Sequence, residues 1–347
     1  MTLSAKYQSV RHLGAGRFLI AILALVLCGA CRPDSRPVKL FGEAQGTYYS
    51  IQYYDSRNRD LQHEVDSLLA DFDMTASLWV DSSLLRRVNR NETDSVNDIF
   101  ADMLRQSLYI NRYTDGAFDC RIGRVVQAWG FSFRTQEAVD SASLTAMLDA
   151  ARGEVTIDGH RVVKQNPATE FDFNAIAQGY TSDLLARYFD SLGISSYLID
   201  VGGEVVAKGQ KADGKPWRVG IERPAEEKSD MPVLQTAIEL RDCSVVTSGS
   251  YRKYYEKDGV RYSHTIDPTT GAPVGHSLLS VSVVEKSGWL ADAMATAYMV
   301  MGLERAKAFI ETHPDGPGTQ SVFFIYDDHG ELATYSTPGF QKLIVEQ

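Results

Sequence analysis

Hydrophobic and polar positions along this 347-residue chain follow two periodicities. Within 61–76 and 97–114, apolar side chains recur three and four positions apart, which is the spacing of one face of an α-helix. Polar and apolar residues alternate in 47–54, 197–201 is mainly apolar, and 279–284 is rich in valine, as expected of strands. The pattern therefore predicts helices and strands interspersed along one chain.

Further segments show the same periodicities, and glycine-containing turns mark hairpins between some of them. We predict additional helices over 144–152, from 180 to 193 and from 289 onward. We predict strands over 217–221, 236–240 and 244–247, and hairpins that turn at 158–159, 258–259 and 328–330. The interspersed hairpins favour an α+β fold with mixed or antiparallel sheets and packed helices over a doubly wound parallel sheet.

The stretch 171–191 joins a short apolar strand to a helix through a turn rich in small residues. Small side chains at Asn174, Ala175, Ala177 and Gly179 let the backbone approach a ligand closely. The N-terminus of the following helix would point its positive end at the same place, which suits a phosphate or a metal-bridged phosphate. The alternative is an ordinary strand–turn–helix connection.

Asp292 and Thr296 are four positions apart, so they share one face of the helix predicted from 289. A carboxylate and a hydroxyl there suit a hard cation such as Mg²⁺, which takes few protein oxygens and completes its shell with water and phosphate. The turn at Ala175 could add a main-chain carbonyl. The alternative is a solvated helix face on which Asp292 stabilises the helix N-terminus.

His264 is predicted to lie on the second strand of the hairpin at 258–259, on the same face as Ile266. A histidine there could remove a proton from a hydroxyl nucleophile near neutral pH, or could be a packing residue. Trp79 and Phe118 could stack on a flat ring or belong to the core. The sequence contains neither the dinucleotide-binding glycine fingerprint, nor a P-loop, nor zinc-ligand spacing.

The N-terminus has the pattern of an export signal. Lys6, Arg11 and Arg17 precede a short apolar run, 18–27, and the small residues that follow end at Cys31. This arrangement resembles a bacterial lipoprotein signal, with 1–30 removed, Cys31 lipidated, 31–39 forming the lipidated cysteine and tether, and 40–347 forming the folded domain. A plain secretory signal is the alternative. We expect an exported lipoprotein, anchored to the membrane through Cys31 and facing the periplasm.

The net charge argues against nucleic acid as a binding partner. The net charge is −10, or −13 without the three basic residues of 1–30, so there is no basic footprint for nucleic acid.

Cys120 and Cys243 are the cysteines that remain in the folded part. They could form a disulfide in an exported protein or remain separate small apolar residues, and we predict no bridge.

Taken in order, the motifs resemble those of the FAD:protein FMN transferases, the ApbE-type flavin transferases, over essentially all of 40–345. The segments that carry the resemblance are 46–47, 83–89, 116–119 with 129–131, 172–180, 201–203, 247–252, 264–268 and 291–297. The resemblance implies that the FAD pyrophosphate is split, that FMN passes to a Thr or Ser hydroxyl of a target protein, and that AMP is released. The family's targets include exported domains of the Na⁺-translocating NADH:quinone oxidoreductase and of the Rnf complex.

The resemblance also implies roles for individual residues. Mg²⁺ would be held by Asp292, Thr296 and the Ala175 carbonyl, with Ala295 at the same edge. FAD would be contacted by Ala117, Phe118, Asp119, Asp172, Gln178 and Ile266, with Gln45 and Trp79 near the flavin. His264 is the candidate base, because its motif adjoins Ile266.

The sequence departs from the family pattern in two places. Cys120, Arg121 and Arg124 follow the Gly-Ala-Phe-Asp motif where the family usually has Pro-Thr and a later Pro, and Gln178 stands where Lys is common. Two alternatives stand beside the transferase. An FAD pyrophosphatase, in which water replaces the acceptor hydroxyl, would use the same residues. An exported lipoprotein that binds FAD without turning it over would need neither the base nor the metal, so Asp292, Thr296 and His264 argue against it.

Overall fold

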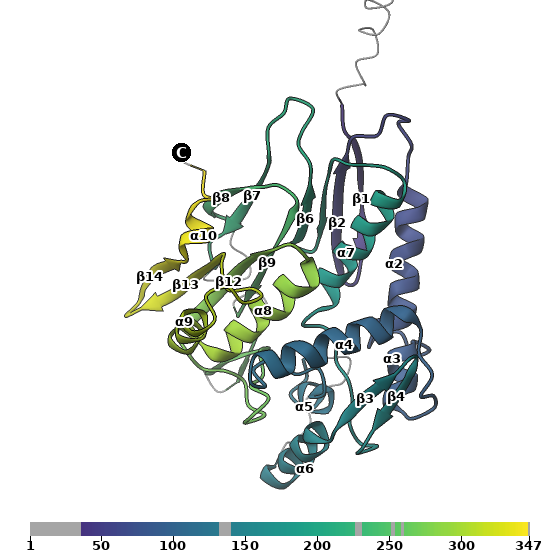
Figure 1. Cartoon of the computed structure of the whole chain (residues 1–347). Helices are drawn as coiled ribbons and strands as arrows, with labels where there is room; N and C mark the ends of the chain where they lie inside the picture. Colours follow the sequence, from purple (N-terminus) through teal and green to yellow (C-terminus); the bar gives the residue numbers. More distant parts are fainter. Residues whose placement is uncertain (1–35, 132–139, 226–230, 251–253, 258–259, 346–347) are drawn as a thin grey trace, which may run out of the picture.

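An eight-stranded sheet forms the centre of the protein in a computed structural model that describes residues 36–131, 140–225, 231–250, 254–257 and 260–345 (Figure 1). Its strand order is β1-β2-β5-β6-β9-β12-β13-β14, and every neighbouring pair is antiparallel. The strands are β1 (Val38–Ala44), β2 (Thr47–Tyr53), β5 (Tyr197–Val201), β6 (Glu204–Lys208), β9 (Cys243–Gly249), β12 (Leu278–Glu285), β13 (Val322–Asp328) and β14 (Glu331–Ser336).

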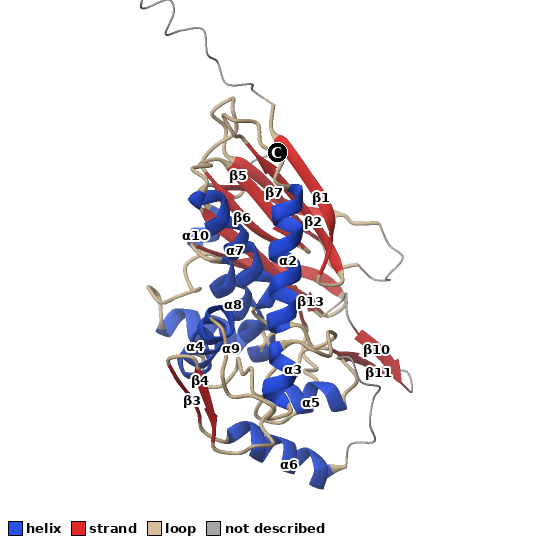
Figure 2. Cartoon of the chain, turned by 90° about the vertical axis from the view of Figure 1, so that its right-hand side faces the viewer, coloured by secondary structure: helices blue, strands red, loops and turns tan. Residues whose placement is uncertain are grey.

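Helices cover one face of this sheet. The long helices α2 (Gln62–Ala76), α7 (Ala177–Ser191) and α8 (Gly288–Met301) lie over it (Figure 2). Helix α7 contacts β5 and β6, while α8 contacts β9 and β12. Apolar residues of α2, α7, β2 and β5 form one core cluster, and α8 packs with β9, β12 and β13 in another. The packing places the N-termini of α7 and α8 beside each other near the middle of the sheet.

The opposite face is covered by a separate two-stranded sheet, β7 (Trp217–Glu222) with β8 (Leu234–Leu240), and by the short helix α10 (Pro338–Gln341). Trp217, Ile238 and Phe340 are fully or almost fully buried there against Val245 and Ile325 of the main sheet. The central strands are therefore buried on both faces, and in β12 Ser280 and Ser282 are buried along with the apolar residues.

A smaller group of elements lies below the sheet in Figure 1. It consists of α3 (Leu84–Asn89), α4 (Asp98–Tyr113), α5 (Gly123–Ala128), α6 (Ser141–Arg152) and the hairpin β3 (Val155–Asp158) with β4 (Arg161–Lys164). Side chains cap these helices as the sequence favours: Asn97 accepts from the Phe100 N–H at 3.0 Å, and Asp140 accepts from the Ser143 N–H at 2.7 Å. Helix α9 (Leu303–Thr312) follows α8, and β10 (Tyr254–Lys257) pairs with β11 (Val260–Ser263).

The structure confirms the α+β class and the antiparallel sheet. Residues 84–89, for which the sequence analysis predicted no helix, form helix α3, and Ser83 caps it by accepting from the Arg86 N–H at 3.2 Å. The structure also shows that β11 ends at Ser263, so His264 and Ile266 follow the hairpin strand instead of lying on it. The turn at 258–259 and the signal sequence with Cys31 lie outside the described residues.

Two further observations bear on the sequence analysis. Cys120 and Cys243 are both free thiols, and Cys120 is buried. Burial raises the pKa of the Cys120 thiol, so this side chain is a core residue that stays protonated. A search of the described residues for a helix long and apolar enough to cross a membrane finds none.

Candidate functional site

The centre of the candidate site is the point where the N-termini of α7 and α8 cross. Gly179 in α7 and Gly288 in α8 pack backbone to backbone: a Cβ added to Gly179 would lie 2.3 Å from the Gly288 carbonyl oxygen. In turn, a Cβ on Gly288 would lie 2.6 Å from the Gly179 carbonyl oxygen. Glycine is therefore required on both helices for this close approach.

Asp292 of α8 faces this crossing. Its Oδ2 accepts a hydrogen bond from the Gly179 N–H at 3.0 Å, and the residue is only 5% exposed. Gly179 is in the first turn of α7, so its amide is one of the N–H groups that a helix cannot satisfy internally. Within the described part of the chain, no group donates to Asp292 Oδ1. One carboxylate oxygen is thus fixed, and the other is available to a ligand.

Burial changes the acidity of Asp292. Desolvation, partly offset by the hydrogen bond from the Gly179 N–H and reinforced by the nearby charge of Asp183, raises the pKa of this carboxyl to about 7. Asp183 is also buried, and desolvation raises the pKa of its carboxyl as well. Two buried carboxylates side by side favour the binding of a cation that would compensate their charge.

Thr296 lies one helical turn after Asp292, on the same face of α8. Its hydroxyl oxygen is 3.5 Å from Ser248 Oγ, at the end of β9. Ala295 is fully buried, so it can offer only its main-chain carbonyl, and Ala175 is half-buried in the turn before α7. Among the residues described, no three His, Cys, Asp or Glu side chains gather into a metal-binding cluster. One carboxylate, one hydroxyl and main-chain carbonyls are a donor set that fits Mg²⁺ rather than a softer metal.

Local hydrogen bonds shape the turn that precedes α7. The Asn174 N–H donates to Asp172 Oδ1 at 2.8 Å, and the Ile176 N–H donates to the Phe173 carbonyl at 3.0 Å. No side chain caps α7 from its own N-cap position, Ile176. In the first turn of α7, the Ala177 N–H donates to the Phe173 carbonyl at 2.8 Å and the Gly179 N–H donates to Asp292, so among the described residues the Gln178 N–H is the amide left for a ligand.

Gln45 and Gln178 reach the same end of α7 from different elements. Gln45, in the turn between β1 and β2, donates from Nε2 to Thr181 Oγ1 at 2.8 Å. Gln178 lies against the turn between β5 and β6, where a Cβ on Gly202 would meet its Nε2 at 2.5 Å and Thr47 at 2.7 Å. The structure thus brings both predicted glutamines to the α7 N-terminus.

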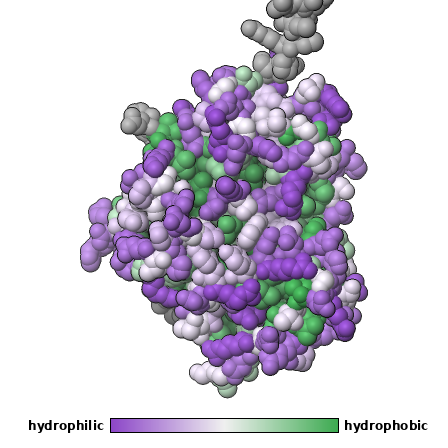
Figure 3. All heavy atoms as spheres, viewed as in Figure 1, coloured by the Kyte–Doolittle hydropathy of each residue, from purple (hydrophilic) through white to green (hydrophobic). Residues whose placement is uncertain are grey.

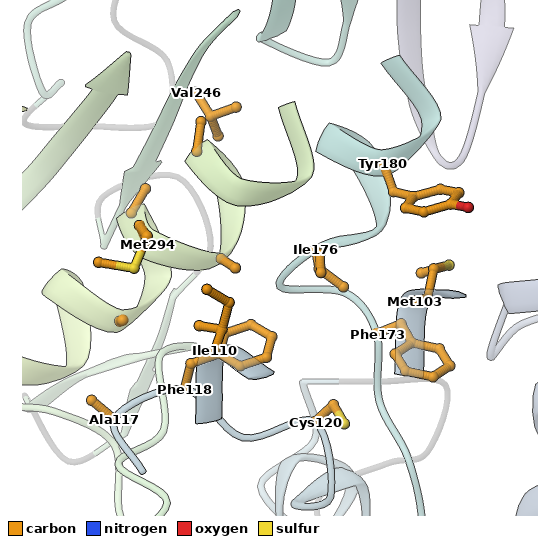
Figure 4. Close-up of a cluster of buried hydrophobic side chains, with 14 of the residues drawn as sticks. Met103, Ile110, Ala117, Phe118, Cys120, Phe173, Ile176, Tyr180, Val246 and Met294 are labelled. Carbon is orange, nitrogen blue, oxygen red and sulfur yellow. The ribbon is translucent and has the colours of Figure 1, made fainter. Parts of the chain in front are cut away.

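The Ala117–Phe118–Asp119 segment is connected to the site through its backbone. The Asp172 N–H donates to the Cys120 carbonyl at 2.8 Å, which joins this segment to the turn before α7. Ala117 and Phe118 are buried in the main core, where Figure 4 shows Phe118 among apolar side chains, so Phe118 offers no exposed ring to stack on a ligand.

Asp119 is held by Arg121, one of the residues that depart from the family pattern. Arg121 donates through Nε and Nη2 to the two carboxylate oxygens of Asp119 at 2.9 and 2.8 Å, and through Nη2 to Asn111 Oδ1 at 3.1 Å. This paired geometry fixes the orientation of the Asp119 carboxylate. Any contact between Asp119 and a ligand would therefore be made by an immobilised, charge-compensated group.

His264 and Ile266 lie in the loop after β11. Ile266 is 4% exposed and packs with Ile122, the N-cap residue of α5, and with Val125 of α5. The half-buried His264 ring is edge-on to Phe131, with ring centroids 6.4 Å apart. Trp79 lies in the loop after α2. Its side chain is 59% exposed, and its main-chain N–H donates to Ser77 Oγ at 3.1 Å.

A groove of about 440 Å³ lies elsewhere, between 91–94 and β4, and none of the predicted site residues lines it. Figure 3 shows apolar side chains on the surface in this region of the molecule, and Val163 of β4 is 50% exposed. This groove is distinct from the α7–α8 crossing.

Sequence reasoning missed Asp183 and assigned no role to Ser248. Asp183 accepts from the N–H groups of Gly288 and Trp289 at 2.8 and 3.0 Å. The signal for Asp183 in the sequence was a carboxylate between apolar residues of a predicted helix. Its hydrogen-bond partners could not be identified from the sequence, because they lie more than 100 positions away.

Comparison with known proteins places the site in context. A sequence model described as the ApbE family matches residues 45–318. The FAD:protein FMN transferase of Vibrio cholerae is 36% identical over 308 residues, covering 85% of this chain and 91% of the relative. That of Escherichia coli K12 is 32% identical over 352 residues, covering 94% and 97%.

Solved structures give the same result. The flavin transferase ApbE from Vibrio cholerae matches with a TM-score of 0.78 at 34% identity, over 89% of this chain and 99% of that one. The apo form of the Pseudomonas stutzeri flavinyl transferase ApbE matches with a TM-score of 0.78 at 32% identity, over 89% and 96%.

Proposed function

The chain belongs to the ApbE family, and from this premise we propose that it transfers the FMN part of FAD to a Thr or Ser hydroxyl of a protein acceptor, with Mg²⁺ bound and AMP released. Its curated relatives are FAD:protein FMN transferases, and this chain is an enzyme of that class. The observation that carries the proposal is the pairing of Asp292, which has one carboxylate oxygen fixed, with Thr296 beside the α7 N-terminus.

In this proposal the α7–α8 crossing binds the FAD pyrophosphate. Mg²⁺, when held by Asp292, Thr296 and the Ala175 carbonyl with Ala295 at the same edge, neutralises charge on the phosphates. The main-chain N–H of Gln178 in the first turn of α7 would orient the same oxygens, and the positive end of the helix favours their charge. Gln178 can donate to phosphate without carrying a charge, which is a weaker contact than the Lys common at this place.

The remaining FAD contacts extend from the crossing in two directions. Gln45, in the β1–β2 turn, and Trp79, with its exposed ring, are proposed to lie beside the isoalloxazine ring. Ile266 and the 117–119 segment with Asp172 are proposed to bound the rest of the molecule. Since Phe118 is buried, its contribution would come from the main chain.

His264 is proposed as the base. The acceptor hydroxyl oxygen forms a bond to the phosphorus on the FMN side, the pyrophosphate bond breaks, and its electron pair leaves with AMP. The acceptor proton passes to His264. Phosphoryl transfer of this kind depends mainly on charge neutralisation and in-line positioning, which the crossing is built to provide.

The acceptor and the location are also proposed. The N-terminal pattern ending at Cys31 supports an exported lipoprotein, anchored to the membrane and facing the periplasm. Exported domains of the Na⁺-translocating NADH:quinone oxidoreductase or the Rnf complex would then be accessible acceptors.

The experiment mixes residues 32–347 with FAD, Mg²⁺ and a candidate acceptor domain, and measures acceptor mass and AMP together. We expect an acceptor that carries FMN, with an equal amount of AMP. AMP with free FMN would show a pyrophosphatase, and bound FAD without products from any acceptor would show a binding protein.

In the same assay, His264→Asn should still bind FAD, measured by flavin fluorescence, but transfer FMN at least about a hundredfold more slowly. Loss of FAD binding would make His264 a binding residue.

A further inference from the structure

Helices α7 and α8 cap each other. Neither has a side-chain cap from its own N-cap residue, Ile176 or Ser287. Instead, Asp292 of α8 accepts from the Gly179 N–H in the first turn of α7. Asp183 of α7 accepts from two N–H groups in the first turn of α8. Each helix therefore supplies the carboxylate that satisfies the exposed amides of the other.

The two carboxylates are used differently. Asp183 is 8% exposed, and its Oδ1 and Oδ2 both accept main-chain hydrogen bonds, from Gly288 at 2.8 Å and from Trp289 at 3.0 Å. Asp292 uses only Oδ2 for its main-chain bond. Asp183 is thus fully committed to holding α8, whereas Asp292 keeps one oxygen for a ligand.

The position of Asp292 depends on the turn that Asp183 holds. Asp292 is four residues after Gly288, so it lies on the same face of α8, one turn from the capped end. The contact between Gly179 and Gly288 leaves no space for α8 to move toward α7. A movement in the opposite direction would break the hydrogen bonds of Asp183 and Asp292 together.

We propose that Asp183 is a positioning residue for flavin transfer: by capping α8 from within α7, it fixes the direction in which Asp292 presents its free oxygen to the metal. This inference rests on the proposed function, because it assigns Asp183 a role in the same metal site. Both oxygens of Asp183 are bound to main-chain amides of α8, so its proposed role is to hold that helix rather than to contact the metal or FAD.

The test compares Asp183→Asn with Asp140→Asn. Both variants remove the charge of a helix-capping carboxylate and keep its size, but Asp140 caps α6, in the lower group of elements, and is exposed. Mg²⁺ binding to each purified protein in the presence of FAD is measured by calorimetry, beside kcat and the Mg²⁺ half-saturation for FMN transfer. Removing a group that orients a metal ligand typically weakens metal affinity about 10–100-fold.

We expect Asp183→Asn to weaken Mg²⁺ binding at least about tenfold, with saturating Mg²⁺ recovering most of kcat. Asp140→Asn should bind Mg²⁺ as the parent protein does. Asp183→Glu keeps the charge but moves it by one methylene, and it should show the same loss, because position rather than charge is what matters.

Mg²⁺ affinity within twofold of the parent in a folded Asp183→Asn would overturn the proposal. A variant that stays unfolded even in saturating Mg²⁺ would also overturn it, since Asp183 would then be needed for the fold itself, whereas folding restored by Mg²⁺ would support it. If the parent protein binds no Mg²⁺, the metal site of the proposed function fails first, and the role of Asp183 fails with it.

Discussion

At the residue scale, two properties of Asp292 together suit it to bind a cation. It is almost fully buried, and only one of its oxygens is engaged by a described donor. Burial makes its charge costly unless a cation compensates it, and the second oxygen gives that cation a place to bind. The same residue therefore closes the α7 N-terminus and carries the proposed metal site.

The raised pKa of the Asp292 carboxyl predicts how metal binding depends on pH. Burial raises the pKa from 3.8 to about 7, so the metal-free folded protein holds a proton there below pH 7. Because the unfolded chain has lost this proton above about pH 4, this group lowers the stability of the metal-free fold as pH rises from about 4 to about 7. A proton must also leave before Mg²⁺ binds, so affinity should fall about tenfold for each pH unit below 7.

Calorimetric titration of Mg²⁺ into the FAD-loaded protein at pH 6, 7 and 8 measures this effect. Asp292→Asn serves as the control and should bind no Mg²⁺ at any of the three pH values. Equal affinities at pH 6 and pH 8 in the parent protein would contradict the assignment of Asp292 as the ligand.

Sequence reasoning reached part of this site at the residue scale. The Asp292–Thr296 pair could be predicted because a spacing of four defines a helix face within one local segment. The contact of Gln45 with Thr181, the bond of Arg121 to Asp119 and the capping by Asp183 could not be predicted, since each depends on how separate segments meet or on a rotamer. Family resemblance supplied the names of Gln45 and Asp119, but not their partners.

At the scale of elements, the α7–α8 crossing depends on Gly179. Replacing Gly179 by Ala would place a Cβ 2.3 Å from the Gly288 carbonyl oxygen and 2.7 Å from Asp292 Cβ, so the helices would have to separate. Such overpacking typically costs about 1–3 kcal/mol, and here the obstacle is backbone. We expect Gly179→Ala to lower the free energy of unfolding by about 2 kcal/mol or more and to abolish FMN transfer.

Urea unfolding and the acceptor-mass assay measure the two effects. Gly275→Ala is the matched control, because a Cβ at this exposed glycine would meet no atom within 4 Å apart from those of its two chain neighbours. An active Gly179→Ala enzyme with the parent's stability would mean that the helices do not need this close crossing.

Long elements could be predicted because their periodicity is carried by many residues, as in α2 with 15 and α4 with 16 residues. The elements that were missed are short or were assigned to other features. Helix α3 has six residues and depends on the Ser83 cap, while β1 begins at Val38, within the stretch interpreted as a tether. In such segments, a single hydrogen bond or pairing with a neighbouring strand decides the structure.

At the scale of the whole molecule, the α+β class followed from the mixture of hairpins and helices, but the strand order did not. The sheet places β9 between β6 and β12, so strands far apart in the sequence are neighbours. This order brings the β1–β2 turn, the β5–β6 turn and the end of β9 to the α7–α8 crossing. Local sequence patterns contain no information about such pairings, which is why the site could be assembled only in three dimensions.

Strand β1 links the N-terminal segment to the site, and this connection gives a last prediction. It pairs with β2 along its whole length, from Val38 opposite Tyr53 to Ala44 opposite Thr47, and it is followed directly by Gln45. Its Leu40 is 4% exposed in the core cluster of α2 and α7. Deleting 1–35 removes none of these contacts, so we expect the melting temperature and FMN transfer to a soluble acceptor to match those of residues 32–347.

Deleting 1–44 should have a different effect. It removes the burial of Leu40, worth about 2 kcal/mol, and leaves the edge of β2 unpaired. It also frees Gln45 from the turn that directs it to Thr181. We therefore expect a free energy of unfolding lower by about 3 kcal/mol or more, and weaker FAD binding, measured by urea unfolding and flavin fluorescence. If the shorter protein kept its stability and FAD affinity, β1 would be dispensable, and the domain would begin at β2.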